Sequence, residues 1–207
     1  MTQATISYTE QVSGKERLSY EEFLRLPADL HAEWVDGEVV CSMTVSRIHD
    51  DLHTFLVMLL GLFLEDRPLG RLQKDPFQMK PAPHLNGRAP DIMFIANEHT
   101  DRLRANFLEG PADLAIEIVS PGNAATDYVD KFREYEAGGV TEYWIFDPVN
   151  QTADFFVLEN GRYERRHPDA EGVYRSAVLS GFWLTTEWLW EQPPVRALLA
   201  EILAPAE

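Results

Sequence analysis

Hydrophobic positions form one long helical pattern near the middle of the first half of the chain. Residues 46–67 begin with polar side chains and contain an apolar run, residues 55–64, before Pro68 and Gly70 end the pattern. Because this run is apolar almost all round, we expect a helix that packs on two sides. The run is about half of the ~20 residues that a helix needs to cross a bilayer, so it indicates a buried helix rather than an anchor.

Three further helices are predicted, two of them from the signals at their ends. Ser19 followed by Glu22 is a capping box, which opens a short helix that ends before Pro27. Residues 126–137 have a helical pattern that a Gly-Gly pair stops, and a last helix is predicted at 194–203. The helix at 126–137 would connect two strands as a crossover, which suits a parallel pair.

Short apolar or alternating segments predict the strands of a sheet. Residues 113–120 form an almost continuous apolar run, as in a strand that is covered on both faces. Asp36-Gly37 and Asn160-Gly161 are dipeptides that suit two-residue hairpin turns. The other predicted strands share these patterns and lie at 31–35, 38–43, 71–79, 91–96, 141–146, 153–158, 162–166 and 174–179.

These elements predict one α/β domain in residues 15–207, with a mixed sheet of the α+β kind and additional antiparallel strands. Residues 1–14 are polar and aperiodic, so we expect a flexible N-terminal segment. A hydrophobic content of 45% and a charged content of 25% are ordinary for a globular domain. One cysteine, Cys41, and a start without a basic segment followed by an apolar one predict a cytoplasmic protein.

The net charge of −16 excludes a generally basic surface. Nucleic-acid affinity rests largely on Lys and Arg side chains that neutralise phosphates. A local cleft for nucleic acid is still compatible with this charge, since bound metal ions supply positive charge and their acidic ligands add to the negative count. We therefore expect any DNA binding to be weak, and no membrane partner.

Glu117 is the most informative position, because it places a carboxylate between Ile116 and Ile118 in a predicted central strand. Burial removes the hydration of a carboxylate, which costs several kcal/mol unless a cation or hydrogen-bond donors compensate. The pattern leaves two interpretations open. One is a structural ion pair with an arginine, and the other is a functional site.

Asp91 stands at the start of another apolar strand, directly after Pro90. If this strand pairs with the strand of Glu117, the two carboxylates can converge on one hard divalent cation such as Mg²⁺, which prefers oxygen ligands and phosphate oxygens. The alternative for Asp91 alone is a side chain that caps a turn.

Six short fragments occur in an order and spacing that together are specific. They are Glu33-Trp34-Val35-Asp36-Gly37-Glu38, Ser46-x-x-His49, Arg88-x-Pro90-Asp91, Leu114-x-Ile116-Glu117-x-x-Ser120-Pro121, Asp127-x-x-x-Lys131-x-x-x-Tyr135 and Gly139-Val140-x-Glu142-Tyr143-Trp144-x-x-Asp147-Pro148. In these fragments the chain resembles the Uma-type restriction endonuclease family of the PD-(D/E)XK nuclease superfamily. The resemblance covers roughly residues 18–190 and implies a restriction-endonuclease-like core, a mixed sheet flanked by helices.

The resemblance also implies a site built from carboxylates and one lysine. Asp91 and Glu117 would be ligands of Mg²⁺ or Mn²⁺, and Glu33 would be a further acidic residue at the edge of the site. Lys131 would be the lysine of the signature. The superfamily usually carries this lysine two residues after the glutamate, where Val119 stands in this chain.

Lys131 could reach the site because its helix leaves the end of the strand that carries Glu117. A lysine one turn into that helix could reach back over the strand. Asp127 lies four residues earlier on the same helix face, so the alternative is an exposed ion pair of ordinary surface type.

His49 and His53 are four residues apart on the predicted long helix. This spacing suggests zinc, but the glutamate of the zinc-protease motif, which would follow the first histidine, is absent. The resemblance implies that His49 approaches the site, and we expect His53 to be structural.

Two functions from different classes follow. The first is a Mg²⁺-dependent DNA endonuclease, in which Asp91 and Glu117 hold the metal and Lys131 orients or helps to deprotonate a metal-bound water. Since duplex cleavage needs two active sites, we expect this enzyme to be a homodimer. The second is a non-catalytic dimeric binding or interaction module that retains the nuclease fold, which the net charge and Val119 favour. An active site needs both carboxylates at one solvent-accessible cleft, whereas the module allows an arginine to neutralise Glu117.

Overall fold

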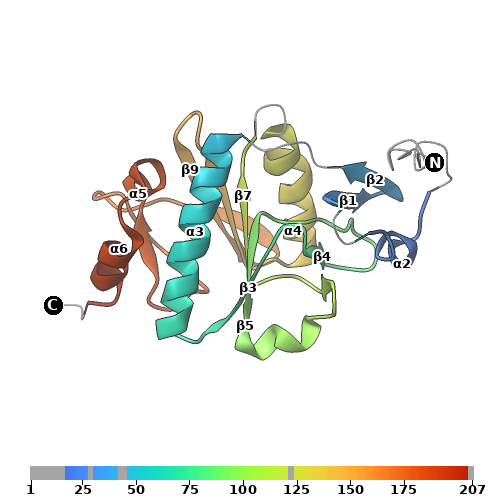
Figure 1. Cartoon of the computed structure of the whole chain (residues 1–207), viewed down its shortest axis with the longest axis horizontal. Coiled ribbons are helices and arrows are strands. Elements are labelled where there is room, and N and C mark those ends of the chain that lie inside the picture. The colour runs from blue at the N-terminus through green and yellow to red at the C-terminus, as the bar shows by residue number, and fades with distance from the viewer. Residues whose placement is uncertain (1–16, 28–29, 42–45, 121–123, 205–207) are drawn as a thin grey trace, which may run out of the picture.

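A six-stranded sheet lies at the centre of the computed structural model, which describes residues 17–27, 30–41, 46–120 and 124–204 (Figure 1). The strands follow the order β10-β9-β8-β7-β5-β3. Their bounds are Gly70–Lys74 for β3, Ile92–Ala96 for β5, Leu114–Ile118 for β7, Glu142–Asp147 for β8, Thr152–Glu159 for β9 and Arg162–Arg166 for β10. β7 and β8 are parallel, and the other neighbouring pairs are antiparallel. This mixed sheet confirms the predicted fold class.

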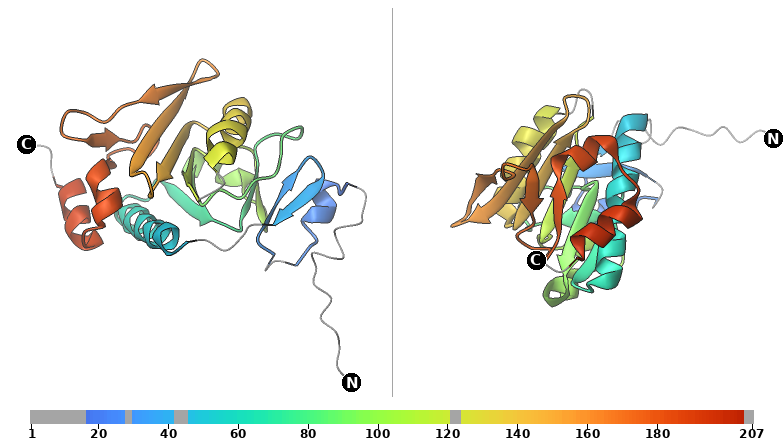
Figure 2. Two further views of the ribbon diagram at one scale, coloured as in Figure 1. Left: turned by 90° about the horizontal axis from the view of Figure 1, so that it is seen from above. Right: turned by 90° about the vertical axis from the view of Figure 1, so that its left-hand side faces the viewer.

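Helices cover both faces of the sheet (Figure 2). On one face lies α3, Arg47–Asp66, with α5, Thr186–Glu191, and α6, Val195–Ile202, in the same apolar layer. On the opposite face lie a π-helix, η2, Thr126–Lys131, and α4, Phe132–Gly138, which follows it directly. Two separate apolar clusters fill the layers between the helices and the sheet.

Alternate side chains of β7 point to opposite faces of the sheet. Ile116 and Ile118 join the apolar cluster on the α3 side, whereas Ala115 and Val119 join the cluster on the α4 side. Glu117 falls between Ala115 and Val119 in this alternation. Its carboxylate is therefore directed into the layer between the sheet and α4.

The predicted crossover from β7 to β8 is confirmed, since the two strands are parallel and η2 and α4 connect them. The helix ends at Gly139, whose φ of 86° is a left-handed conformation that glycine adopts at no steric cost. Its first part is a π-helix rather than the expected α-helix. Such wider turns occur mostly as single-turn insertions and are frequent at functional sites.

A smaller unit packs at one end of the sheet (Figure 1). It contains α2, Tyr20–Phe23, the hairpin of β1, Ala32–Val35, and β2, Glu38–Cys41, and the parallel pair of β4, Gln78–Lys80, and β6, Phe107–Glu109. Both bonds of the predicted capping box are present in α2, and Asp36 and Gly37 have the positive φ angles that the hairpin turn requires. Trp34 exchanges two backbone hydrogen bonds with Gly87, which fixes β1 beside Arg88. The predicted flexible segment, residues 1–14, and the end of the predicted strand at 42–43 lie outside the described residues.

The predicted strand at 71–79 is wrong, because two strands, β3 and β4, occupy this segment in different sheets. Pro76 lies between them and has no N–H for a ladder hydrogen bond. Phe77 N donates instead to Lys74 O, which closes a turn. The short helix η1, Asn97–Arg102, and β6 follow β5 and were not predicted.

The predicted strand at 174–179 is correct only at its start. β11, Val173–Arg175, pairs with β12, Trp183–Thr185, which was not predicted, and α5 follows β12. Beyond β11 the N–H groups of Ala177 and Val178 donate to the buried carboxylate of Glu142. The backbone therefore leaves the extended conformation to surround this carboxylate.

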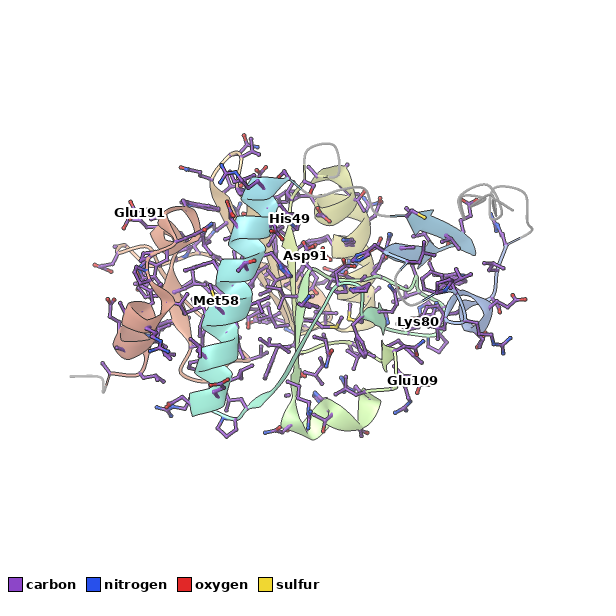
Figure 3. The ribbon with its side chains drawn as sticks, in the orientation of Figure 1. His49, Met58, Lys80, Asp91, Glu109 and Glu191 are labelled. Carbon is purple, nitrogen blue, oxygen red and sulfur yellow. The ribbon has the colours of Figure 1, made fainter. Side chains whose placement is uncertain are left out.

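The long helix α3 lies where it was predicted, with Ser46 as its N-cap. One face is buried against the sheet, but Met58 on the outer face is 48% exposed (Figure 3). The expectation of packing on two sides is confirmed, because α3 contacts both the sheet and α6, although this outer position stays uncovered among the described residues. Among the described residues, no helix combines the length and the apolar character that crossing a membrane requires.

Candidate functional site

The residues predicted for the site come from four separate elements and lie in one cluster. Asp91 directly precedes β5, Glu117 lies on β7, Lys131 ends η2 and Glu33 lies on β1. His49, in the first turn of α3, joins the cluster beside Asp91 (Figure 3). Ion pairs and hydrogen bonds connect the members, so segments far apart in the sequence meet at this end of the sheet.

Glu117 is held by two donors from the helix that covers it. Lys131 Nζ lies 2.8 Å from Oε2, and the hydroxyl of Tyr135 donates to Oε1 at 2.8 Å. The residue is 2% exposed. Its cation is a lysine rather than the arginine of the structural interpretation.

Lys131 is buried, with 8% of its surface exposed, and contacts three carboxylates. Its Nζ lies 2.8 Å from Glu117, 3.2 Å from Asp127 and 3.6 Å from Glu33. The alternative of an exposed surface pair with Asp127 is wrong, because Asp127 is also buried. A helix face that packs on a buried carboxylate carries polar residues. Its sequence pattern is therefore the same as that of a solvent-exposed face, and the burial of Lys131 and Asp127 was not predicted.

Asp91 connects β7 to α3. Its Oδ2 accepts a hydrogen bond of 2.6 Å from the N–H of Ile118, the residue after Glu117, and its Oδ1 lies 3.4 Å from His49 Nε2. The backbone carbonyl of Asp91 lies 3.1 Å from His53 Nε2, which gives His53 a structural contact. The side chain of Asp91 is 20% exposed, whereas that of Glu117 is 3% exposed. Solvent therefore reaches the cluster at Asp91.

Glu33 is tied to the cluster through Arg88. The guanidinium of Arg88 donates to Glu33 Oε2 at 2.9 Å and binds Glu134 with two parallel hydrogen bonds of 2.7 and 2.8 Å. Ala89 N donates to the second oxygen of Glu33 at 3.1 Å. Arg88 thus joins β1 to α4 across the edge of the site, because a planar guanidinium can serve two carboxylates at once.

Carboxylates outnumber cations in this cluster. Glu33, Asp91, Glu117, Asp127 and Glu134 face the fixed positive charges of two side chains, Lys131 and Arg88. Burial raises the pKa of Glu117 well above its ordinary value, and the neighbouring acids raise it further while Lys131 opposes them. Burial and the same repulsion raise the pKa of Asp127.

The pKa values of Lys131 and Asp91 instead shift in the direction that favours their charged forms. Burial disfavours the ammonium of Lys131, but the surrounding carboxylates outweigh this effect and hold its pKa well above the ordinary value. Lys131 therefore stays charged. For Asp91, burial raises the pKa, but His49 and Lys131 overcome this and the net pKa is lowered. For His49, burial lowers the pKa, but Asp91 overcomes this and the net pKa is raised. The carboxylates still repel one another, and a bound cation would relieve this repulsion.

The donor chemistry of the cluster fits a hard divalent cation. Asp91 and Glu117 offer carboxylate oxygens, and Mg²⁺ is commonly bound through one or two carboxylates while it keeps several waters. Within the ranges that the structure describes, no set of three or more His, Cys, Asp or Glu side chains is placed to hold a metal. A metal site would therefore rest on these two carboxylates, and zinc at His49 and His53 gains no support.

Sequence reasoning gave no role to Arg88, Glu134 and Tyr135. Arg88 and Tyr135 belong to the fragments that carry the family resemblance, but their contacts cannot be inferred from spacing. Glu134 had a usable signal, since it lies three residues after Lys131 and seven after Asp127 and so shares their helix face.

Comparisons with known proteins agree with this architecture. The Uma2 family profile, described as "Putative restriction endonuclease", matches residues 20–187. A crystal structure described as a "putative nuclease belonging to DUF820" from Anabaena variabilis superposes with a TM-score of 0.68 and 21% sequence identity, over 83% of this chain and 96% of that chain. No curated protein matches the chain. Since the family profile covers most of the sequence, from α2 to α5, the chain belongs to the Uma2 family of restriction-endonuclease-like proteins.

Proposed function

We propose that the chain is a Mg²⁺- or Mn²⁺-dependent endonuclease that hydrolyses phosphodiester bonds in DNA. The observation that carries the proposal is the 2.8 Å contact between Lys131 Nζ and Glu117 Oε2, in the cluster that also holds Asp91. Two carboxylates and a lysine are the groups of the nuclease signature. In this chain the lysine comes from η2, and Val119 occupies its usual position.

Asp91 and Glu117 would hold the cation. When bound, the cation would supply positive charge beside the scissile phosphate and lower the pKa of a water molecule. Lys131 fixes one oxygen of Glu117 and adds positive charge toward the phosphate, while Tyr135 fixes the other oxygen. These contacts exist before substrate binds, so little reorganisation is required during the reaction.

Glu33 would act at the edge of the site. Its carboxylate lies 3.6 Å from Lys131 and is oriented by Arg88. Glu33 therefore supports the position of the ammonium from β1.

DNA affinity is expected to be weak and to depend on the bound cation. The chain carries 34 acidic residues against 18 Lys and Arg, so its mean field repels phosphate. Each phosphate that the protein neutralises makes binding more sensitive to salt. The homodimer and the cytoplasmic location stay predictions.

The second candidate is a non-catalytic dimeric interaction module with the same fold. Its support is that Lys131 and Tyr135 already satisfy both oxygens of Glu117, which is what a structural buried glutamate requires. The net charge of −16 also favours the interaction module, because it opposes the binding of phosphates. In that function Asp91 and Glu117 would be structural polar residues.

A metal titration of DNA cleavage separates the two candidates. We expect the wild type to cleave with Mg²⁺ or Mn²⁺, and Glu117→Gln to lose at least about 10²-fold in rate, since it removes the charge while keeping the shape. Glu191→Gln, at an exposed position far along the chain, is the matched control and should keep full activity. Circular dichroism would verify that each variant is folded. A wild type that cleaves neither single-stranded nor duplex DNA with any divalent metal would favour the interaction module.

A further inference from the structure

The carboxylate of Asp91 is held from two directions, by β7 and by α3. The N–H of Ile118 donates to Oδ2 at 2.6 Å, and Nε2 of His49 lies 3.4 Å from Oδ1 (Figure 3). Each carboxylate oxygen has two lone pairs, so both contacts leave room for a cation. These two contacts therefore set the direction in which the remaining lone pairs of Asp91 point.

Within the part of the chain that the structure describes, the imidazole of His49 has one hydrogen-bonding or ion-pair partner, Asp91. The residue is 5% exposed, and its Nδ1 is buried without a hydrogen-bond partner. Its backbone N–H donates to the side chain of Ser46 at 3.3 Å, which fixes it in the first turn of α3. A buried ring nitrogen without a partner costs free energy that an apolar side chain at this position would avoid. Packing of α3 alone therefore gives no reason for a histidine here, whereas the contact with Asp91 does.

We propose that His49 is a positioning residue, which directs the carboxylate of Asp91 toward the bound cation. The inference rests on the proposed function and adds a further residue to the same site. Groups that hold a ligating carboxylate in place fix its orientation, and their loss typically weakens metal affinity by about 10–100-fold. His49 would not touch the cation itself, because Nε2 faces Asp91 and Nδ1 is enclosed.

A second histidine–aspartate pair closes the opposite end of the same two strands. Asp113 directly precedes β7, and its Oδ2 accepts a hydrogen bond of 2.7 Å from the N–H of Ala96. Its Oδ1 lies 2.7 Å from His99 Nδ1. Since β5 and β7 are antiparallel, Asp113 and Asp91 lie at opposite ends of the pair. The pair of Asp113 and His99 thus has the same arrangement without a proposed ligand, and it shows what such a pair does for the fold alone.

Binding of Mn²⁺ in the absence of DNA tests the positioning role separately from cleavage. Electron paramagnetic resonance of free Mn²⁺ gives the dissociation constant of each variant, and circular dichroism verifies that each is folded. His49→Leu removes the contact with Asp91, whereas His49→Gln keeps an N–H donor at about the place of Nε2. His99→Leu, which breaks the other pair, is the matched control. If His49→Leu does not fold, His49→Asn takes its place, since its shorter amide does not reach Asp91.

His49→Leu should bind Mn²⁺ at least about tenfold more weakly than the wild type, whereas His49→Gln and His99→Leu should stay within about threefold. Wild-type affinity of His49→Leu, or an equal loss in His99→Leu, overturns the positioning role. A wild type that binds no Mn²⁺ up to about 10 mM also overturns it.

Cleavage assays on the same proteins separate this inference from the proposed function. The expected order of Mn²⁺ affinities in a protein that cleaves no DNA would refute the proposed enzyme and leave the positioning role standing. Metal-dependent cleavage by the wild type, with unchanged Mn²⁺ affinity in His49→Leu, would refute the positioning role alone.

Discussion

Lys131 is buried among three carboxylates, and this arrangement changes what it contributes to the fold. Its ammonium lies within 3.6 Å of Glu117, Asp127 and Glu33. Burial of a charge costs several kcal/mol, which these contacts offset. Removal of one partner from a buried pair typically costs about 3–5 kcal/mol, because the remaining charge is left uncompensated. A much smaller contribution would be expected from an exposed pair on a helix.

Lys131→Met should therefore destabilise the protein by about 3 kcal/mol and abolish metal-dependent cleavage. Arg133→Met, an exposed position on the same helical segment, should change stability by less than about 0.5 kcal/mol. Urea denaturation followed by circular dichroism measures both variants. In the double variant Lys131→Met/Glu117→Gln one of the three carboxylates that lost their cation is also neutral, so stability should recover in part while cleavage stays absent. Wild-type stability of Lys131→Met would show that the pair is energetically unimportant.

From the residue pattern alone, without the family resemblance, a member of the candidate site could be predicted only where it conflicts with its surroundings. Glu117 conflicts with the apolar strand around it, and the structure does place it in the interior. Lys131 lies on a helix face that looks the same whether it meets water or a buried carboxylate, so its burial was missed. Arg88 and Glu134 meet only through tertiary packing of separate segments, which spacing along the chain does not contain.

Glu142 shows how one residue can organise an element. Its carboxylate, at the start of β8, is fully buried and accepts five hydrogen bonds, three of them from residues 176–178. The other two come from Trp144 Nε1 and the hydroxyl of Tyr174. These donors replace the hydration that the carboxylate loses. Glu142 thereby anchors the segment after β11 to the central sheet.

Glu142→Ala should destabilise the protein by at least about 3 kcal/mol, because five donors lose a charged acceptor. Glu142→Gln should have an intermediate effect, since its amide nitrogen would face donors. Glu164→Gln, exposed on β10, is the matched control and should leave the unfolding free energy unchanged. Equal denaturation midpoints for Glu142→Ala and the wild type would refute the anchoring role.

Elements with local end signals were predicted best. The capping box at Ser19, the Ser46 cap and the Asp36-Gly37 turn each set a boundary through contacts within a few residues. The segments that were missed depend on distant partners. β4 pairs with β6, and β11 pairs with β12. The partner strands β6 and β12 carry no strong sequence pattern of their own. The strand predicted at 174–179 is wrong beyond Arg175, because the backbone N–H groups of Ala177 and Val178 donate to Glu142, more than thirty residues earlier.

The whole molecule is strongly acidic and encloses two apolar clusters, one on each face of the sheet. Of the apolar run at 55–64, five side chains are buried within one chain, and Met58 is exposed on the outer face of α3. Apart from the adjacent residues and the backbone of its own helix, nothing lies within 4 Å of the position that a Cβ would take at Gly61, close to Met58. A homodimer could therefore bury only the exposed part of this run, and the outer face of α3 around Met58 is one candidate interface.

Sedimentation equilibrium tests the predicted homodimer. The wild type should have a mass of about 47 kDa at micromolar concentration, twice the 23.6 kDa of one chain. Met58→Glu should shift the equilibrium toward the monomer if α3 forms the interface. Val149→Glu, which alters an exposed apolar residue between β8 and β9, should have no effect. A wild type that sediments only as a monomer would refute the predicted homodimer.

Cleavage of circular DNA is the most direct test of the central claim, since a circle has no ends and only an endonuclease can open it. Single-stranded and supercoiled circles would be incubated with Mg²⁺ or Mn²⁺ and analysed by gel electrophoresis. The wild type should open at least one of them, a chelator should stop the reaction, and Asp91→Asn should reduce its rate by at least about 10²-fold. Glu191→Gln should cleave like the wild type. Intact circles with every metal, or full activity of a folded Asp91→Asn variant, would contradict the assignment of Asp91, Glu117 and Lys131 as a nuclease site.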